Sequence, residues 1–220
     1  MPLPAQVACA ILELGEQLLR EIRSGTDPRV PLLRAAVATI AFYMFFNRGA
    51  CGAGALRGDL TVSDAHISLL LRNEKGHKKL GPAQYHSRQI ACISVPRIAA
   101  VLRALFARQE SLGSRVRRWA LSPEEDLERW TADTSTVWLQ MAYGAAGHQP
   151  PDGFSWTSHS LRKGAASAAY AIGARLTDIR YAGGWSTNST VLTSKYIDFT
   201  MQPSPEARMF FDFLIKGPLQ

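Results

Sequence analysis

The chain has 220 residues, of which 46% are hydrophobic and 20% are charged. This composition is ordinary for a globular protein, and the length is enough for one domain with a substantial core or for two small domains. The net charge of +7 and the pI near 9.6 favour an anionic partner such as nucleic acid, without identifying it.

Two further features exclude other classes of protein. The three cysteines, Cys9, Cys51 and Cys92, are far apart and form no CxxC pair. We therefore expect no disulfide framework and no metal site, and a reducing compartment. The first apolar stretch is interrupted by Glu13 and Glu16, so it is neither a signal peptide nor a membrane span.

The first half of the chain predicts two helices followed by a β-hairpin. Residues 5–24 form an amphipathic pattern that ends at Gly25. The next helix begins near Pro31 and runs to about Phe46, and because it is apolar nearly all round it should be buried. Residues 65–72 and 89–95 read as strands on either side of a polar turn at residues 73–79.

The middle of the chain predicts further helices. Residues 96–111 are amphipathic, residues 122–125 have a helix-start signature, and residues 134–145 suggest another helix. A linker over residues 147–153 then leads to the most informative part of the chain. The tail after Pro205 is strongly apolar, so it either packs on its own chain or docks on a neighbouring subunit.

A helix is predicted after Thr157 or Ser158, either of which can accept an orphan backbone N–H, and Gly173 is its expected stop. His159 and Arg162 are three residues apart, so both lie on one face near the start of this helix. That end carries partial positive charge and favours a phosphate.

Two shorter helices are predicted next. Thr177 is the expected cap of the first, which ends at a Gly-Gly pair before Trp185. Ser189 or Thr190 is expected to cap the last, in which three residues should share one face and so aim the tyrosine: Leu192, Tyr196 and Phe199.

Each of these features has a simpler interpretation, such as a surface pair, a turn beside a core tryptophan, or a packed tyrosine. In their order and spacing, however, His159, Arg162, Trp185 and Tyr196 resemble the catalytic segment of the tyrosine recombinases, the phage-integrase-type family. The resemblance covers roughly residues 5–216. It implies a mainly α (α+β) fold, a helical catalytic domain with a small antiparallel β-sheet. We expect residues 1–220 to form that one domain, without the N-terminal core-binding domain usual in the family.

The resemblance also implies a first catalytic arginine, just after the buried helix. Arg48 occupies that position, Asp59 matches the acidic residue before the sheet, and Arg57 is the rival arginine. The family often has an acidic residue three positions after the arginine, where this chain has Cys51. The surrounding segment is glycine-rich, which weakens a helix by about 1 kcal/mol per glycine.

The family places its catalytic lysine in the hairpin, where Lys75 is the first candidate and Lys78 the next. Other basic residues are predicted to contact DNA phosphates, with a merely solvated basic loop as the alternative for those after residue 110. These residues are Lys78, Lys79, Arg115, Arg117, Arg118 and Lys163.

The implied chemistry is attack by Tyr196 on a DNA phosphodiester, which leaves a 3′-phosphotyrosyl bond and a free 5′-hydroxyl. His159 would take or share the phenol proton, and Lys75 would protonate the leaving oxygen. Arg48 and Arg162, with Trp185, would stabilise the phosphate charge. No metal, cofactor or ATP is expected.

The distance from Trp185 to Tyr196, 196 − 185 = 11 positions, is slightly longer than is common in the family. This extra length would loosen the tyrosine-bearing helix or swing it toward a neighbouring subunit.

Three interpretations stay open at this point: a strand-exchange enzyme, a catalytically weak DNA-binding remnant, and a topoisomerase IB-like nicking-closing enzyme. All three imply double-stranded DNA as partner. The resemblance further implies homo-oligomers on DNA joined through the C-terminal helix, and no membrane association. The block from Gly183 to Asn188, with the residues after Tyr196, also resembles recombinases of eukaryotic DIRS-type mobile elements. A nuclear location is expected for a eukaryotic host and a cytoplasmic one otherwise.

Overall fold

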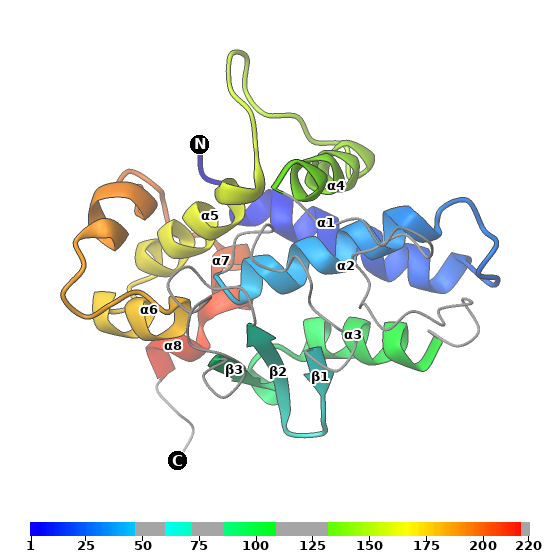
Figure 1. Ribbon diagram of the computed structural model, residues 1–220, viewed down its shortest axis with the longest axis horizontal. Helices are drawn as coiled ribbons and strands as arrows, with labels where there is room; N and C mark the ends of the chain where they lie inside the picture. The colour runs from blue at the N-terminus through cyan, green and yellow to red at the C-terminus, as the bar shows by residue number, and fades with distance from the viewer. Residues whose placement is uncertain (47–59, 72–85, 109–131, 217–220) are drawn as a thin grey trace.

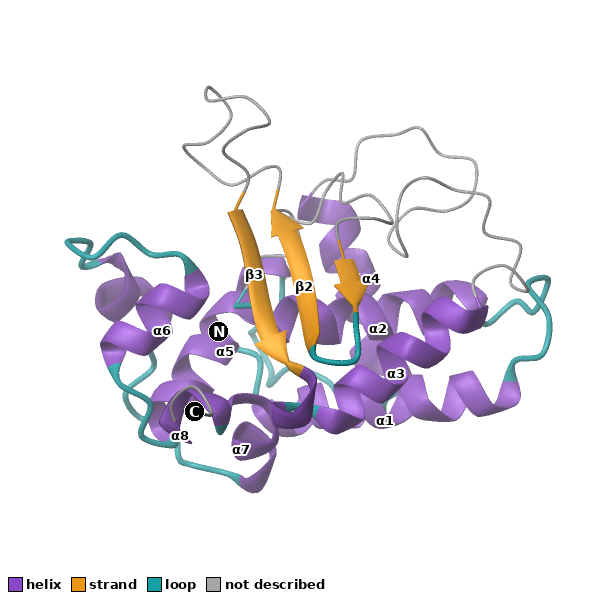
Figure 2. Ribbon diagram, turned by 90° about the horizontal axis from the view of Figure 1, so that it is seen from below, coloured by secondary structure: helices purple, strands orange, loops and turns teal. Residues whose placement is uncertain are grey.

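The computed structural model describes residues 1–46, 60–71, 86–108 and 132–216. These residues form helices α1 to α8, two single helical turns and a three-stranded sheet. The predicted mainly helical fold with a small antiparallel sheet is confirmed. The sheet lies below the two helices of residues 5–44 in Figure 1, and the helix of residues 96–108 lies beside it (Figures 1 and 2).

Helix α2 (Val30–Met44) lies at the centre of the helical layer (Figure 1). It packs against α1 (Ala5–Glu21), α3 (Pro96–Arg108), α4 (Ala132–Ala145) and α5 (Ser158–Ala171). Every one of its residues from position 35 to 44 is buried, as the run of apolar residues predicted. Helix α1 ends at Glu21, earlier than expected, because Ile22 turns to an extended conformation and buries its side chain in the core.

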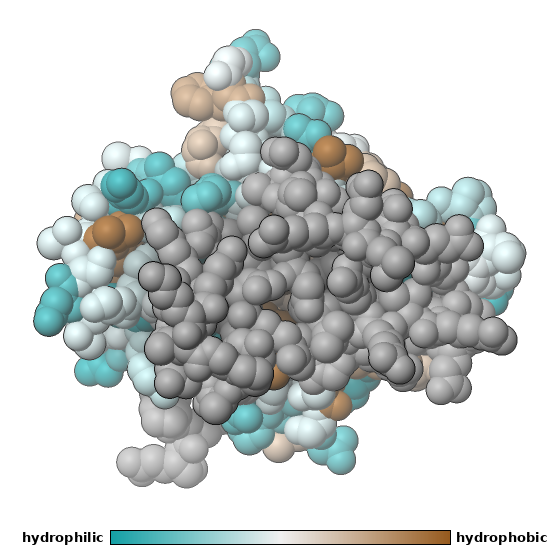
Figure 3. All heavy atoms as spheres, viewed as in Figure 1, coloured by the Kyte–Doolittle hydropathy of each residue, from teal (hydrophilic) through white to brown (hydrophobic). Residues whose placement is uncertain are grey.

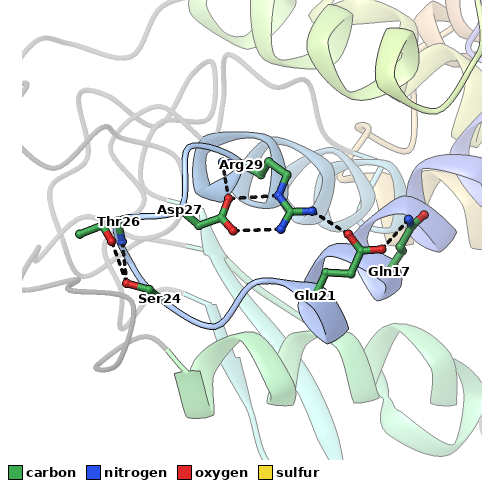
Figure 4. A network of polar contacts seen from close by, with 6 residues as sticks. All are labelled: Gln17, Glu21, Ser24, Thr26, Asp27 and Arg29. Carbon is green, nitrogen blue, oxygen red and sulfur yellow. Dashed lines mark hydrogen bonds and ion pairs between the residues drawn. The ribbon is translucent and has the colours of Figure 1, made fainter.

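The connection between α1 and α2 is closed by the guanidinium of Arg29 (Figure 4). Arg29 donates to both carboxylate oxygens of Asp27, at 3.1 and 2.9 Å, and to Glu21 at 2.6 Å. Hydrogen bonds from Arg29 hold the pKa of the Asp27 carboxyl below its ordinary range. The pKa of the Glu21 carboxyl is lowered mainly by a hydrogen bond from Gln17. Arg29 and Glu21 are solvent-exposed, so the network orients the turn more than it stabilises the fold.

The sheet has the strand order β1 (Leu60–Val62), β2 (His66–Leu71) and β3 (His86–Ala91), with both pairings antiparallel (Figure 2). Ile67 is paired with Ile90, and both are buried. The first predicted strand is confirmed. The second begins three residues earlier than expected and gives way to a 3₁₀ turn, Cys92–Ser94. Strand β1 was missed because three residues are too few to show alternation. The predicted hairpin turn and the helix start at residues 122–125 lie outside the described residues.

The last third of the chain forms α5, α6 (Leu176–Gly183), a π-helical turn (Leu192–Tyr196), α7 (Pro205–Phe211) and α8 (Phe213–Lys216). Helix α5 packs against all of the first three elements that follow it, namely α6, the π-helical turn and α7. It therefore joins the end of the chain to the central helix α2, which it also contacts.

The aromatic residues of α7 pack in cis on the end of α2. The ring of Phe211 lies 5.5 Å from that of Tyr43 and 4.9 Å from that of Phe46, and Phe210 meets Tyr43 edge-on at 5.1 Å. All four side chains are buried, and burial raises the pKa of the Tyr43 phenol. Two alternatives were predicted for the apolar tail. For α7 the structure shows the first of them, since this helix packs on its own chain.

The coloured surface in Figure 3 is mostly hydrophilic, with apolar side chains that stand apart from one another. Ile93, Phe154, Tyr181 and Phe199 are the most exposed large apolar or aromatic residues of the described part of the chain. No helix among the described residues is both long enough and apolar enough to span a membrane.

The aromatic contact between α7 and α2 predicts a large stability effect. Phe211→Ala should lower the free energy of unfolding by about 3–5 kcal/mol, because the buried ring leaves a cavity between Tyr43 and Phe46. Phe154→Ala is the matched control, since its ring is 60% exposed, and it should change stability by less than about 0.5 kcal/mol. Urea denaturation of both variants measures the difference, and equal losses would contradict the assigned packing.

Candidate active site

The start of α5 is fixed by local hydrogen bonds. Thr157 precedes the helix in an extended conformation, and its N–H donates to Oγ of Ser160 at 2.9 Å. This arrangement confirms the predicted helix start, and Gly173, with φ 98°, follows the helix end as expected. His159 lies in the first turn with an exposed side chain, and Arg162 follows it in the next turn, half-buried.

The guanidinium of Arg162 is held by the backbone at the end of α2. Its Nη1 donates to the carbonyl oxygen of Phe46 at 2.6 Å. Phe46 has a left-handed φ of 55°, a conformation that costs a residue other than glycine about 1–2 kcal/mol. The hydrogen bond from Arg162 and the packing of the Phe46 ring on Phe211 hold this residue in place.

Trp185 covers one face of the same guanidinium. The Cζ atom of Arg162 lies 3.6 Å from the centre of the Trp185 ring, the geometry of a cation–π contact. The tryptophan is only 9% exposed, which lowers the dielectric constant around the cation and strengthens the contact.

The end of α6 sets the direction of Trp185. Gly184 takes a left-handed φ of 66°. The N–H of Trp185 donates to the backbone carbonyl oxygen of Arg180 at 2.9 Å, as in a Schellman motif. The indole ring then folds over Gly183, where a Cβ atom would overlap it. The expected cap at Thr177 is wrong, because the helix already begins at Leu176, after an extended Arg175.

Tyr196 ends the π-helical turn, next to this pair. Its ring centre lies 5.4 Å from that of Trp185 and 5.5 Å from Cζ of Arg162. The turn is closed by a hydrogen bond of 3.1 Å from the N–H of Ile197 to the carbonyl of Leu192, and both of these side chains are buried. Three of the sequence-predicted residues, Arg162, Trp185 and Tyr196, therefore meet in one cluster.

One expectation about this region is wrong. Phe199 does not share a helical face with Leu192 and Tyr196, since the helical turn has ended and its ring lies 5.2 Å from Tyr170. Tyr181, which lies in α6, is 91% exposed.

Asp198, two residues after Tyr196, forms a local turn. Its carboxylate accepts hydrogen bonds from the Thr200 hydroxyl at 2.6 Å and from the Thr200 N–H at 3.0 Å. These two bonds, with a weaker effect of the half-buried Lys163, hold the pKa of Asp198 below its ordinary range. The segment after Tyr196 is thus ordered by its own side chains.

Arg88 is a residue that the sequence did not single out. It lies opposite the buried Leu69 in the β2–β3 pairing and donates from Nη1 to the carbonyl oxygen of Phe45 at 2.9 Å. Arg88 is two positions before the buried Ile90 on the same strand, so both side chains lie on one face of the sheet. This spacing was the signal available in the sequence. The predicted strand begins one residue after Arg88, at residue 89, and therefore leaves Arg88 out.

The structure leaves several predicted residues unplaced because they lie outside the described residues. They are Arg48, Cys51, Arg57, Asp59, Lys75, Lys78, Lys79, Arg115, Arg117 and Arg118. Across residues 1–46, 60–71, 86–108 and 132–216, no group of three or more His, Cys, Asp or Glu side chains could hold a metal ion.

Comparison with solved structures agrees on the fold. The crystal structure of XerH site-specific recombinase bound to palindromic difH substrate, a post-cleavage complex, matches 98% of this chain and 50% of its own, with a TM-score of 0.55 and 13% identity. The pre-cleavage complex of XerH with difH substrate matches 95% of this chain and 49% of its own, again with a TM-score of 0.55 and 13% identity.

The likeness shows that the chain has the fold of a tyrosine recombinase catalytic domain. The chain spans about half the length of the XerH chain in each of these two structures. No family model and no curated protein matches the sequence.

The contact between Trp185 and the end of α6 predicts a specific sensitivity to added volume. Gly183→Ala should push the indole ring away from Arg162 and destabilise the fold by about 1–3 kcal/mol, as overpacking does. Gly144→Ala on α4 is the control, because a Cβ there meets only ordinary contacts and alanine favours a helix by up to about 1 kcal/mol. Urea denaturation tests both, and a stabilising Gly183→Ala would refute the close approach.

Proposed function

We propose that this chain cleaves and rejoins DNA strands in site-specific recombination, through a 3′-phosphotyrosyl intermediate. The observation that carries the proposal is the cluster in which the Arg162 guanidinium lies against Trp185, with the Tyr196 ring 5.5 Å away. The fold shared with a DNA-bound recombinase and the net charge of +7 support the same conclusion.

Arg162 is suited to bind the scissile phosphate. A guanidinium is planar, always charged and rich in donors, so it matches the non-bridging oxygens of a phosphodiester. Its face lies against Trp185 and its Nη1 is bonded to Phe46, which fix its orientation before DNA arrives. Preorganised donors of this kind stabilise the charge that develops at phosphorus, without reorganisation during the reaction. The indole N–H of Trp185 would add one donor.

Tyr196 would be the nucleophile. Its phenol oxygen attacks phosphorus, the bond from phosphorus to the 5′-oxygen breaks, and the energy of the backbone bond is kept in the phosphotyrosine. An unperturbed phenol titrates near 10, so a base must take or share its proton at neutral pH. His159, exposed in the first turn of α5, is the proposed partner.

Arg48 and Lys75 would complete the site. Arg48 comes two positions after Phe46 in the sequence, and Arg162 donates to the Phe46 carbonyl. Lys75, in the β2–β3 connection, would protonate the leaving 5′-oxygen.

The partner would be double-stranded DNA, contacted also by Lys163 and by the basic residues of the β2–β3 connection and of the segment between α3 and α4. We propose homo-oligomers on the DNA, with the residues that follow α7 as the docking segment because Ile215 in α8 is 41% exposed. A DIRS-type mobile element as source, and with it a nuclear location, belongs to the same proposal.

Tyr196→Phe tests the proposal directly. The protein is mixed with nicked duplexes of randomised sequence, in which the cleaved end is lost and the covalent intermediate accumulates. Wild type should give a denaturation-resistant protein–DNA band, whereas Tyr196→Phe should give none because only the hydroxyl is removed. Tyr181→Phe is the matched control and should behave as wild type, since that tyrosine is 91% exposed.

The other outcomes separate the competing functions. An adduct that persists in Tyr196→Phe and maps to another residue would refute the nucleophile. DNA binding without any adduct would favour a DNA-binding remnant. Adduct formation with relaxation of supercoils, but without joining of two duplexes, would favour a topoisomerase-like enzyme.

The geometry also predicts cleavage in cis, because Tyr196 lies 5.5 Å from Arg162 of its own chain. A mixture of Tyr196→Phe with Arg162→Ala places an intact tyrosine and an intact arginine on different subunits. In cis cleavage neither chain has both groups, so the mixture should form no more adduct than the two variants alone. Restored adduct in the mixture would show that the tyrosine is donated in trans.

A further inference from the structure

Ser167, a buried serine of α5, makes hydrogen bonds to the backbone on both sides of Ile197. Its side chain is 0% exposed and faces the segment that carries Tyr196. Its Oγ lies 3.1 Å from the carbonyl oxygen of Tyr196 and accepts the N–H of Asp198 at 2.8 Å. The same Oγ lies 2.8 Å from the carbonyl oxygen of Lys163, one turn earlier in α5.

A hydroxyl has one proton to donate and two lone pairs to accept with. The proton of Ser167 is therefore shared between the carbonyls of Lys163 and Tyr196, while a lone pair receives Asp198. The first of these bonds lies within α5 and would form in any helix. The other two reach residues about thirty positions later, on either side of Ile197, and tie that segment to the helix.

We propose that Ser167 is a positioning residue, which holds the backbone on both sides of Ile197 and thereby fixes where the Tyr196 side chain lies relative to Arg162. This inference rests on the proposed function. The apolar contacts of Leu192 and Ile197 fix the depth of the π-helical turn, but they are non-directional. The hydrogen bonds of Ser167 are directional and act on the peptide groups next to the tyrosine.

Loss of the hydroxyl would leave two part-buried backbone groups, the Tyr196 carbonyl and the Asp198 N–H, without this partner. Unpaired buried groups are costly, so the segment would shift or admit water. The reacting atoms of a displacement at phosphorus must be close and aligned, and a misplacement of about 1 Å can cost about a hundredfold in rate. DNA affinity depends mainly on phosphate contacts elsewhere and should not change.

The experiment compares Ser167→Ala with wild type on the nicked duplex, at protein concentrations that saturate the DNA. The rate of adduct formation should fall by about tenfold to a hundredfold, while the Kd for duplex DNA stays the same. Hydrogen exchange of the Asp198 amide, measured without DNA, should be faster in the variant. Should Ser167→Ala fail to fold, Ser167→Cys is measured in the same way, because its slightly larger thiol is a weak donor and acceptor and would weaken all three hydrogen bonds.

Ser204→Ala is the matched control. Ser204 also accepts a backbone N–H, from Ala207 at 3.1 Å, but this bond caps α7 instead of the segment that carries Tyr196. This variant should lower the melting temperature and leave both the adduct rate and the Asp198 exchange unchanged. If Ser167→Ala and Ser204→Ala lose the same fraction of the adduct rate, the loss comes from general destabilisation of the fold, and the proposal is overturned.

Two other results would also overturn it. A wild-type rate in Ser167→Ala would show that the hydroxyl does not position the tyrosine. Absence of any adduct from the wild type would refute the proposed function and the positioning role with it, whereas slow exchange of the Asp198 amide in that protein would still show the hydrogen bonds themselves.

Discussion

The contact between the Arg162 guanidinium, the Phe46 carbonyl and the Trp185 ring is the interaction on which the candidate site depends. It joins the end of α2, the first turns of α5 and the end of α6, which are far apart in the sequence. A half-buried cation must find such partners, because burial without them is costly. The same contact brings Tyr196 beside the cation, since the tyrosine ring packs edge-on against Trp185.

The end of α2 links this contact to the hydrophobic core. Two arginines from different elements donate to the carbonyls of the two residues that follow α2: Arg88 from β3 to Phe45, and Arg162 from α5 to Phe46. The ring of Phe46 then packs on Phe211 of α7. Strand β3, helix α7 and the candidate site thus meet at the end of α2. A loss of packing there would also displace the Arg162 guanidinium.

Local patterns predicted what depends on local physics. The apolar run of α2 required a buried helix, and Thr157 and Gly173 marked the ends of α5 within two residues. The sequence could not show the π-helical turn at Tyr196, because a period of 3.6 was assumed and the closing bond spans five residues. Ser167, among alanines, reads as a small packing residue, since its partners lie about thirty positions away.

The effect of the 196 − 185 = 11 positions between Trp185 and Tyr196 depends on how the two ends of this segment are held. A longer segment moves freely only if its ends are free. Here the first end is fixed by the hydrogen bond from Trp185 to Arg180, and the second by the bonds of Ser167 around Ile197. The additional length is taken up by the turns between these two anchors, where mostly exposed residues follow Trp185. In this structure the Tyr196 ring lies 5.5 Å from Cζ of Arg162 of the same chain, although the connection to it is long.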